Sequence, residues 1–152
     1  MLIDLTQLDV DGPHLDWGLP LDIPHAVLRD LLPDAHLTPV IIEDGVIVWA
    51  PGELNQGRRS RLANKAQRRA LRARYPKCVV HGCGVHFINC KVHHLIWWRH
   101  GGRTDLVNLA PVCTKHHGDI HAGQLTLTRQ ADWSFTTTYK TLRPPGPTAT
   151  AA

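Results

Sequence analysis

Apolar and polar positions alternate in short runs through the second half of the chain, a pattern that predicts strands separated by turns. A first strand is expected at residues 88–92 and a return strand at residues 109–112, joined by a long loop at residues 98–107. A short helix at residues 114–122 should follow, with Gly123 as the residue after its end. Two further strands complete the pattern, at residues 125–128 and 134–138.

The first half of the chain carries weaker patterns. Asp, Pro and Gly interrupt residues 1–23, so little regular structure is expected there. Pro24 can begin a short helix that ends at Pro33. Two β-branched runs then flank Asp44-Gly45, a strong signal for a two-residue hairpin. This part of the chain is predicted to be a small packing segment.

A strongly basic helix is predicted between these two halves. Asn64 and Gln67 have the spacing of a capping box, and Pro76 should end the helix after Tyr75. Leu71 and the alanines give the helix only a thin apolar stripe. Eight cations cover the remaining surface of the helix and the residues before it: Arg58, Arg59, Arg61, Lys65, Arg68, Arg69, Arg72 and Arg74.

The net charge of +4 conceals a sharp division along the chain. Residues 1–57 hold ten acidic residues against one arginine, a net charge of −9. Residues 58–152 hold sixteen basic residues against three aspartates, a net charge of +13. So basic a segment favours a polyanionic partner, and nucleic acid is the first expectation. The basic helix would contact the phosphate backbone.

The sequence also bounds the cellular compartment and the use of its cysteines. It has no run of 18 apolar residues, and its acidic N-terminus lacks a basic signal region. We therefore expect neither a membrane span nor membrane binding, and we expect a cytoplasmic location. Four cysteines in that compartment favour thiolate ligands over disulfides. A thiol redox protein is disfavoured by the C-x4-C spacing and by the lack of a βαβ pattern.

Two short-spaced ligand pairs predict a structural zinc site. Cys78 and Cys83 form the first pair, and Cys113 and His116 form the second, about thirty residues later. Such spacing is typical of closed, four-coordinate zinc sites, and thiolate with imidazole suits zinc better than it suits hard cations.

The remaining histidines predict a second, different site. On the last predicted helix His117 and His121 lie 40° apart on one face, whereas His116 points about 100° away from His117. His93 and His94 end the first predicted strand and point to opposite sides. One of that pair can share a metal with the helix while the other stays free as a base. A base, a divalent cation and a basic helix together outline a nuclease.

These residues resemble the HNH endonucleases, the ββα-metal class that includes colicin-type DNases. The resemblance rests on His93-His94, Gly101-Gly102, TDLVNL and CTKHH, and covers roughly residues 58–123. It implies an α+β fold with a ββα-metal core and a structural zinc knuckle, preceded by a basic helix and a small hairpin and helix module. The expected divisions are an acidic segment at 1–57, the basic helix at 58–77, the HNH domain at 78–140 and a disordered tail at 141–152.

The resemblance also implies roles for individual residues. His93 would bind the catalytic metal and His94 would be the general base. Asn108 would tie the loop and orient the base. His117 and His121 would complete the metal's protein ligands. The structural zinc ligands of zinc-stapled members fall at Cys78, Cys83, Cys113 and His116.

Two positions depart from the family pattern. Trp97 stands where many members of this branch carry a third histidine, so any catalytic or DNA contact of that histidine is missing here. Cys90 does not fit a four-ligand zinc site, and we interpret it as a small buried strand residue; a ligand role is the alternative.

The implied activity is hydrolysis of DNA, double-stranded in the first instance, to 5′-phosphate and 3′-hydroxyl ends. The cofactors would be a structural Zn²⁺ and a catalytic Mg²⁺, Mn²⁺, Ni²⁺ or Zn²⁺. The competing hypothesis is a non-catalytic, zinc-dependent nucleic-acid-binding module, against which the spare imidazole of His94 argues. The residues expected to contact DNA are Arg61, Lys65, Arg68, Arg69, Arg72, Arg99 and Arg103.

Overall fold

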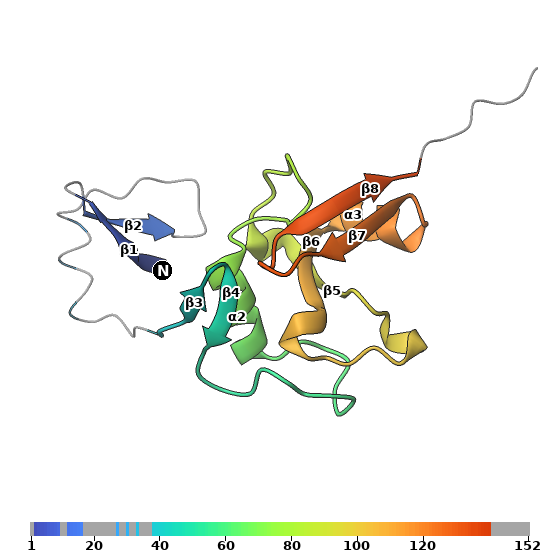
Figure 1. Ribbon diagram of the computed structural model, residues 1–152, viewed down its shortest axis with the longest axis horizontal. Helices are drawn as coiled ribbons and strands as arrows, with labels where there is room; N and C mark the ends of the chain where they lie inside the picture. The colour runs from blue at the N-terminus through green and yellow to red at the C-terminus, as the bar shows by residue number, and fades with distance from the viewer. Residues whose placement is uncertain are drawn as a thin grey trace, which may run out of the picture.

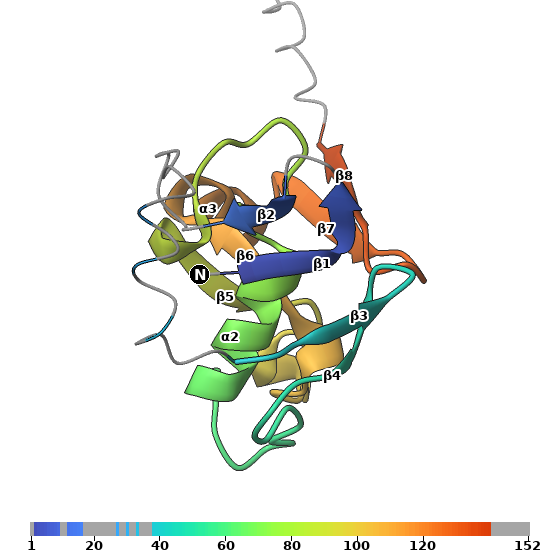
Figure 2. The ribbon, with the colours of Figure 1, turned by 90° about the vertical axis from the view of Figure 1, so that its left-hand side faces the viewer.

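The structure, a computed structural model, describes residues 38–140 in full, the backbone of residues 2–9 and 12–16, and Val27, Asp30 and Pro33. In this part of the chain helices combine with four small antiparallel sheets of two strands each, so the fold is α+β (Figures 1 and 2). None of its helices is long and apolar enough to cross a membrane.

The N-terminal segment contains more regular structure than its sequence predicts. Strands β1 (Leu2–Asp9) and β2 (Gly12–Asp16) pair antiparallel where little structure is expected. Its register pairs Asp9 with Gly12, so a connection of two residues joins the strands. The helix predicted between Pro24 and Pro33 lies largely outside the described residues, as does the predicted tail.

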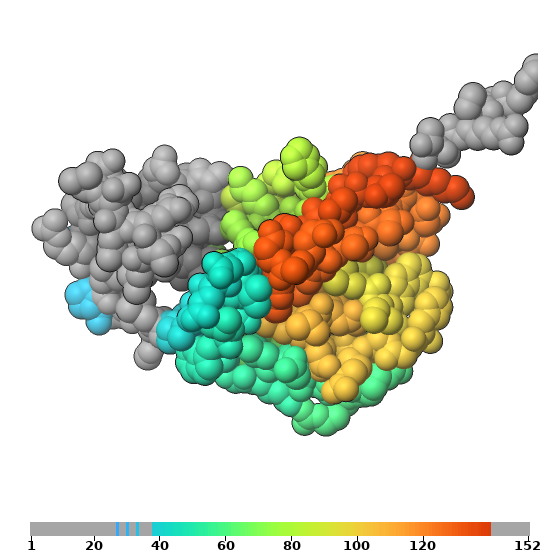
Figure 3. All heavy atoms as spheres, in the orientation of Figure 1, coloured from blue at the N-terminus to red at the C-terminus, as the bar shows by residue number. Residues whose placement is uncertain are grey.

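The hairpin predicted around Asp44-Gly45 is confirmed. Strands β3 (Ile41–Glu43) and β4 (Val46–Trp49) pair across it. Asp44 has φ 46° and Gly45 has φ 80°, as a type I′ turn requires at both central positions. In Figure 3 this hairpin (cyan) lies against the turn between β7 and β8, and a Cβ on Gly45 would come within 2.5 Å of Asp132 O.

Helix α2 (Lys65–Arg74) has the predicted capping box, because Asn64 and Gln67 exchange side-chain and backbone hydrogen bonds. Its thin apolar stripe is sufficient because Ala70 and Leu71 are fully buried. They belong to the larger of two core clusters, whose bulky buried members are Ile47, Leu71, Tyr75, Phe87, Leu106, Leu109 and Trp133.

Strands β5 (Cys90–His94) and β6 (Leu109–Cys113) pair antiparallel from Cys90↔Cys113 to His94↔Leu109. The predicted start of the first strand at residue 88 is wrong by two residues. Phe87–Asn89 forms a turn of 3-10 helix that buries Phe87, so the extended backbone begins only at Cys90. Every residue of β6 is buried.

The loop between β5 and β6 contains two short 3-10 turns, η3 (Trp98–His100) and η4 (Leu106–Asn108). Helix α3 (Thr114–His121) follows β6 directly, and Ala122 is its C-cap. Gly123 comes next and has φ 70°, the left-handed backbone typical of the residue after a helix.

The last hairpin, β7 (Leu125–Arg129) with β8 (Phe135–Tyr139), packs through β7 on α3. The second core cluster lies under it and consists of Cys78, Val80, Cys90, Val112, Cys113, Ile120 and Leu125.

Candidate metal centres and the adjoining cleft

Four sulfur and nitrogen atoms from two distant segments meet at the start of α3. His116 Nδ1 lies 3.5 Å from Cys78 Sγ and 3.3 Å from Cys113 Sγ. Cys83 Sγ lies 4.0 Å from Cys113 Sγ. All four ligand atoms lie within 4.8 Å of one another. The two pairs singled out by their sequence spacing therefore converge on one point, which we call the cysteine-rich cluster.

These separations fit a tetrahedral zinc site. With Zn–S of about 2.3 Å and Zn–N of about 2.1 Å, tetrahedral angles place two sulfurs about 3.8 Å apart and a sulfur and a nitrogen about 3.6 Å apart. The observed separations differ from these values by a few tenths of an ångström. The two sulfurs of Cys83 and Cys113 are about twice as far apart as in a disulfide, and both thiols are free. The cluster can hold a metal such as zinc.

The protonation state of the cysteines is set by their surroundings. Burial raises the pKa of the Cys78 thiol to about 12, so this thiol keeps its proton unless a metal displaces it. Burial also works to raise the pKa of Cys113. Hydrogen bonds from the His116 and Lys115 N–H groups at the start of α3 nevertheless lower that pKa below its ordinary value.

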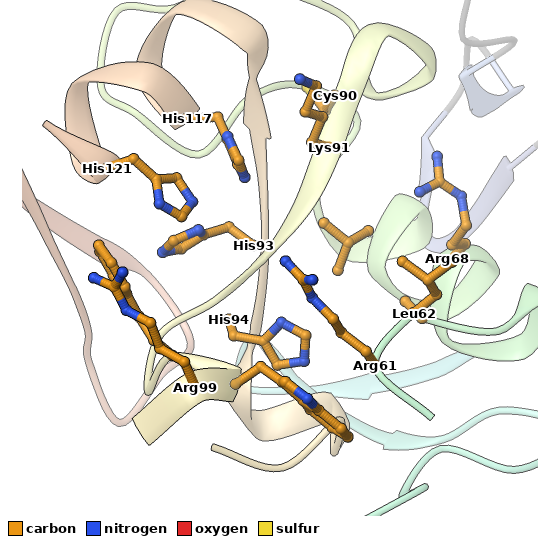
Figure 4. Close-up of a pocket in the computed structure, with 14 residues that line it drawn as sticks. Arg61, Leu62, Arg68, Cys90, Lys91, His93, His94, Arg99, His117 and His121 are labelled. Carbon is orange, nitrogen blue, oxygen red and sulfur yellow. The ribbon is translucent and has the colours of Figure 1, made fainter. Parts of the chain in front are cut away.

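A second cluster, here called the three-histidine cluster, gathers the imidazoles of His93, His117 and His121. Their ligand nitrogens lie within 4.8 Å of one another. The His93 ring centre is 5.4 Å from that of His117 and 5.5 Å from that of His121 (Figure 4). Burial lowers the pKa of His93 to about 4, so this imidazole is neutral and its lone pair is free for a metal. Three protein ligands leave coordination positions open, as in catalytic sites.

The side chains of His93 and His94 leave β5 on opposite sides, as strand geometry requires. His94 belongs to neither cluster. Its Nε2 lies 2.9 Å from the hydroxyl of the fully buried Thr104. The same hydroxyl lies 3.4 Å from Arg61 O, to which it can donate. When it does, His94 Nε2–H is the donor to Thr104 and Nδ1 carries the lone pair.

The charge state of His94 is also set by its surroundings. Burial, together with the positive charges of Arg61 and Arg58, lowers its pKa. The imidazole is therefore neutral at neutral pH, the state in which it can accept a proton.

Asn108 ties the two ends of the loop that follows His94. Its Nδ2 donates to Ile96 O at 3.0 Å and to Arg103 O at 2.8 Å. Its Oδ1 accepts from Ile96 N at 2.7 Å. The chain crosses itself so closely here that a Cβ on Gly102 would lie 1.7 Å from Ile96 O. Asn108 thus ties the loop, and Gly102 is required by the close approach.

Arg58, in the segment before α2, also binds this loop. Arg58 Nη1 donates to Trp98 O at 2.6 Å and to Gly102 O at 2.9 Å. Its guanidinium also covers the Trp98 ring at 3.9 Å, and that ring packs 5.9 Å from His94. Arg58 therefore contacts the loop, although its sequence position suggests a DNA-contacting cation.

A cleft of about 920 Å³ joins the three-histidine cluster to His94 (Figure 4). Its walls come from the segment before α2, from α2 itself through Arg68, from β5, from the start of the β5–β6 loop and from α3. The cations that line it are Arg61, Arg68, Lys91 and Arg99, and no Asp or Glu is among the described residues that line it.

The seven cations predicted to contact DNA divide into two groups. Arg61, Arg68 and Arg99 line the cleft, whereas Lys65, Arg69 and Arg72 lie on α2 and do not. Arg103 also lies outside the cleft lining, because its Nε pairs with Asp105 Oδ2 at 2.7 Å.

Two residues of this region were not predicted from the sequence: Lys91, which lines the cleft, and Thr104, which contacts His94. Lys91 lies two residues before His93, so strand alternation would have placed both on one side of β5. No sequence signal singles out Thr104, whose partner His94 is ten residues away.

Trp97 and Cys90, the two departures from the family pattern, have structural explanations. The Trp97 ring centre lies 4.6 Å from that of His121, so the indole packs beside the three-histidine cluster. Cys90 is buried and its Sγ lies 3.5 Å from His86 O, outside the four clustered ligand atoms. Its position agrees with the prediction of a small buried strand residue.

Comparison with known proteins finds no relative: no protein-family model, no curated protein and no solved structure matches the chain. Function has to be inferred from the residues that converge on the cleft. These are three imidazoles around one point, a fourth imidazole held by a hydroxyl, and four cations.

Proposed function

We propose that this protein is a metal-dependent endonuclease of the HNH type, with β5, β6 and α3 as its ββα-metal core, and that it hydrolyses phosphodiester bonds in DNA. One observation carries the proposal: His94, which belongs to neither cluster, lines the same cleft as His93, His117 and His121. A purely structural metal site needs no spare imidazole. Hydrolysis needs both a base and a cation site.

His94 would act as the general base. Its Nδ1 accepts the proton of a water molecule as the water oxygen attacks phosphorus, and the bond from phosphorus to the 3′-oxygen breaks. The products are a 5′-phosphate and a 3′-hydroxyl. Thr104 holds Nε2 at 2.9 Å and so fixes the orientation of the imidazole during this step. A positioned base of this kind contributes roughly 10²–10⁴-fold to the rate.

The three-histidine cluster would hold the catalytic divalent ion, Mg²⁺, Mn²⁺, Ni²⁺ or Zn²⁺. A bound ion supplies Lewis-acid polarisation of a phosphoryl oxygen and stabilises the leaving alkoxide. His93 would offer its imidazole from the buried side, anchored in β5, while His117 and His121 project from α3. The cysteine-rich cluster, with zinc bound, would hold the start of that helix in place.

The cations would hold the DNA backbone. Arg61, Arg68 and Arg99 reach the cleft from three different segments, so they can contact phosphates on either side of the reacting bond. The cleft is open and contacts of this kind carry no base information, which favours double-stranded DNA as substrate with the backbone as the main contact.

Nicking of a supercoiled plasmid tests the proposal. Protein treated with a chelator that spares the zinc of the cysteine-rich cluster should lose activity and regain it with one or more of the four ions. His94→Ala should bind DNA and melt normally but nick at least about 100-fold more slowly. His100→Ala is the matched control, because His100 is exposed and lies outside the cleft lining. DNA binding without nicking under any ion would instead support the non-catalytic zinc-dependent binding module.

A further inference from the structure

The cleft has an unusual balance of charge for a site that would hold a divalent cation. The three ligands of the three-histidine cluster are imidazoles, which are neutral when they bind a metal. The described residues around them add four cations and no carboxylate: Arg61, Arg68, Lys91 and Arg99. An ion that enters this site meets positive charge on every side that is described.

These charges are close enough to act on the bound ion. Figure 4 shows Arg61 reaching from the segment before α2 into the space between His93 and His94. Arg99 Cζ lies 4.2 Å from the Trp97 ring centre, and that centre lies 4.6 Å from the His121 ring centre. The Arg99 charge is therefore within about 10 Å of the cluster, the distance over which 0.1 M salt screens charges.

The two most direct of these charges are not neutralised by the protein itself. No ion pair involves Arg61 or Lys91 within the described part of the chain. A phosphodiester carries one negative charge, so it would partly neutralise them, and its oxygens could also contact the ion.

We infer that the divalent ion and the phosphodiester bind this cleft cooperatively, so that each raises the affinity of the cleft for the other. The inference rests on the metal site of the proposed function. Without the anion, cations in the cleft oppose metal binding; with it, they are compensated. Because binding free energies are linked, the metal must raise phosphodiester affinity by the same factor. Charges at these separations make the expected factor roughly 10-fold, within the range of 5- to 150-fold typical of coupled sites.

Titration with Co²⁺, followed by its visible absorption, measures this coupling on the full chain with zinc in the cysteine-rich cluster. The probe is dimethyl phosphate, a phosphodiester that binds free divalent ions weakly. Its saturating presence should lower the apparent Kd for Co²⁺ about 10-fold relative to chloride at equal ionic strength. His117→Ala gives the signal of any Co²⁺ bound elsewhere.

Arg61→Gln tests whether the cleft charges cause the coupling. It should tighten Co²⁺ binding in chloride and reduce the effect of dimethyl phosphate by several-fold. Lys140→Gln removes one charge from an exposed site outside the cleft and should change neither value. Equal Kd values with and without dimethyl phosphate in the unaltered protein would overturn the inference. Plasmid nicking is scored separately, so coupling without cleavage would refute only the proposed function, and cleavage without coupling only the inference.

Discussion

Helix α3 presents two neighbouring histidines to two clusters of opposite character. His116 turns toward three cysteines, two of them buried, and completes the four donors of the cysteine-rich cluster. His117 turns toward the cleft and joins two other imidazoles, of which His121 is exposed. Four donors close a tetrahedral coordination shell, whereas three donors at a cleft wall leave room for substrate. The number of donors and their burial therefore separate a closed candidate metal site from one with open coordination positions, even though both use the same helix.

The largest effect should follow when the cysteine-rich cluster is disrupted. Cys113→Ser should abolish tight zinc binding and unfold residues 78–140, because structural zinc contributes about 10–16 kcal/mol, as much as the total stability of many domains. Zinc content by elemental analysis, with thermal melting by circular dichroism, measures both. A variant without zinc that melts like the parent would show that the cluster is not needed for folding.

The same experiment on the neighbouring cluster sharpens the contrast. The His117→Ala variant should retain zinc and melt at the same temperature as the parent. Its affinity for the added divalent ion should fall at least about 10-fold, so it should nick DNA only at raised metal concentration. The measurement is nicking rate against metal concentration. If His117→Ala unfolds like Cys113→Ser, the two clusters are one structural unit and their distinction fails.

The smallest effects should come from removing single positive charges, and these effects should differ between cations that line the cleft and cations on the exposed face of α2. Arg61→Gln and Arg68→Gln remove charges that line the cleft, whereas Arg69→Gln removes one from the exposed face of α2. Each lost phosphate contact should lower the salt dependence of DNA binding by about 0.9 in log–log slope, equally for all DNA sequences. Binding titrations over a range of salt measure the slope. Only the cleft variants should also slow cleavage at saturating DNA, and an equal loss of cleavage rate from Arg69→Gln would argue against this division.

The local features of this protein follow from its sequence because they depend on residues within one turn of each other. The capping box of Asn64 and Gln67 and the Asp44-Gly45 turn are set by neighbouring backbone groups. The helical period separates His116 from His117 in the same way. Spacing therefore separates His116 from His117 and His121, whereas the choice of His93 over His94 came from the family resemblance. The structure brings both ligand sets together.

The supports of His94 were decided only by the tertiary structure. Thr104 reaches it from the β5–β6 loop, and Arg58 holds that loop at Trp98 from 40 residues away. Such contacts join segments whose separation in sequence carries no periodic signal. The division of the ligands on α3 was thus determined by local spacing, whereas the surroundings that set orientation, charge and access arose from long-range packing.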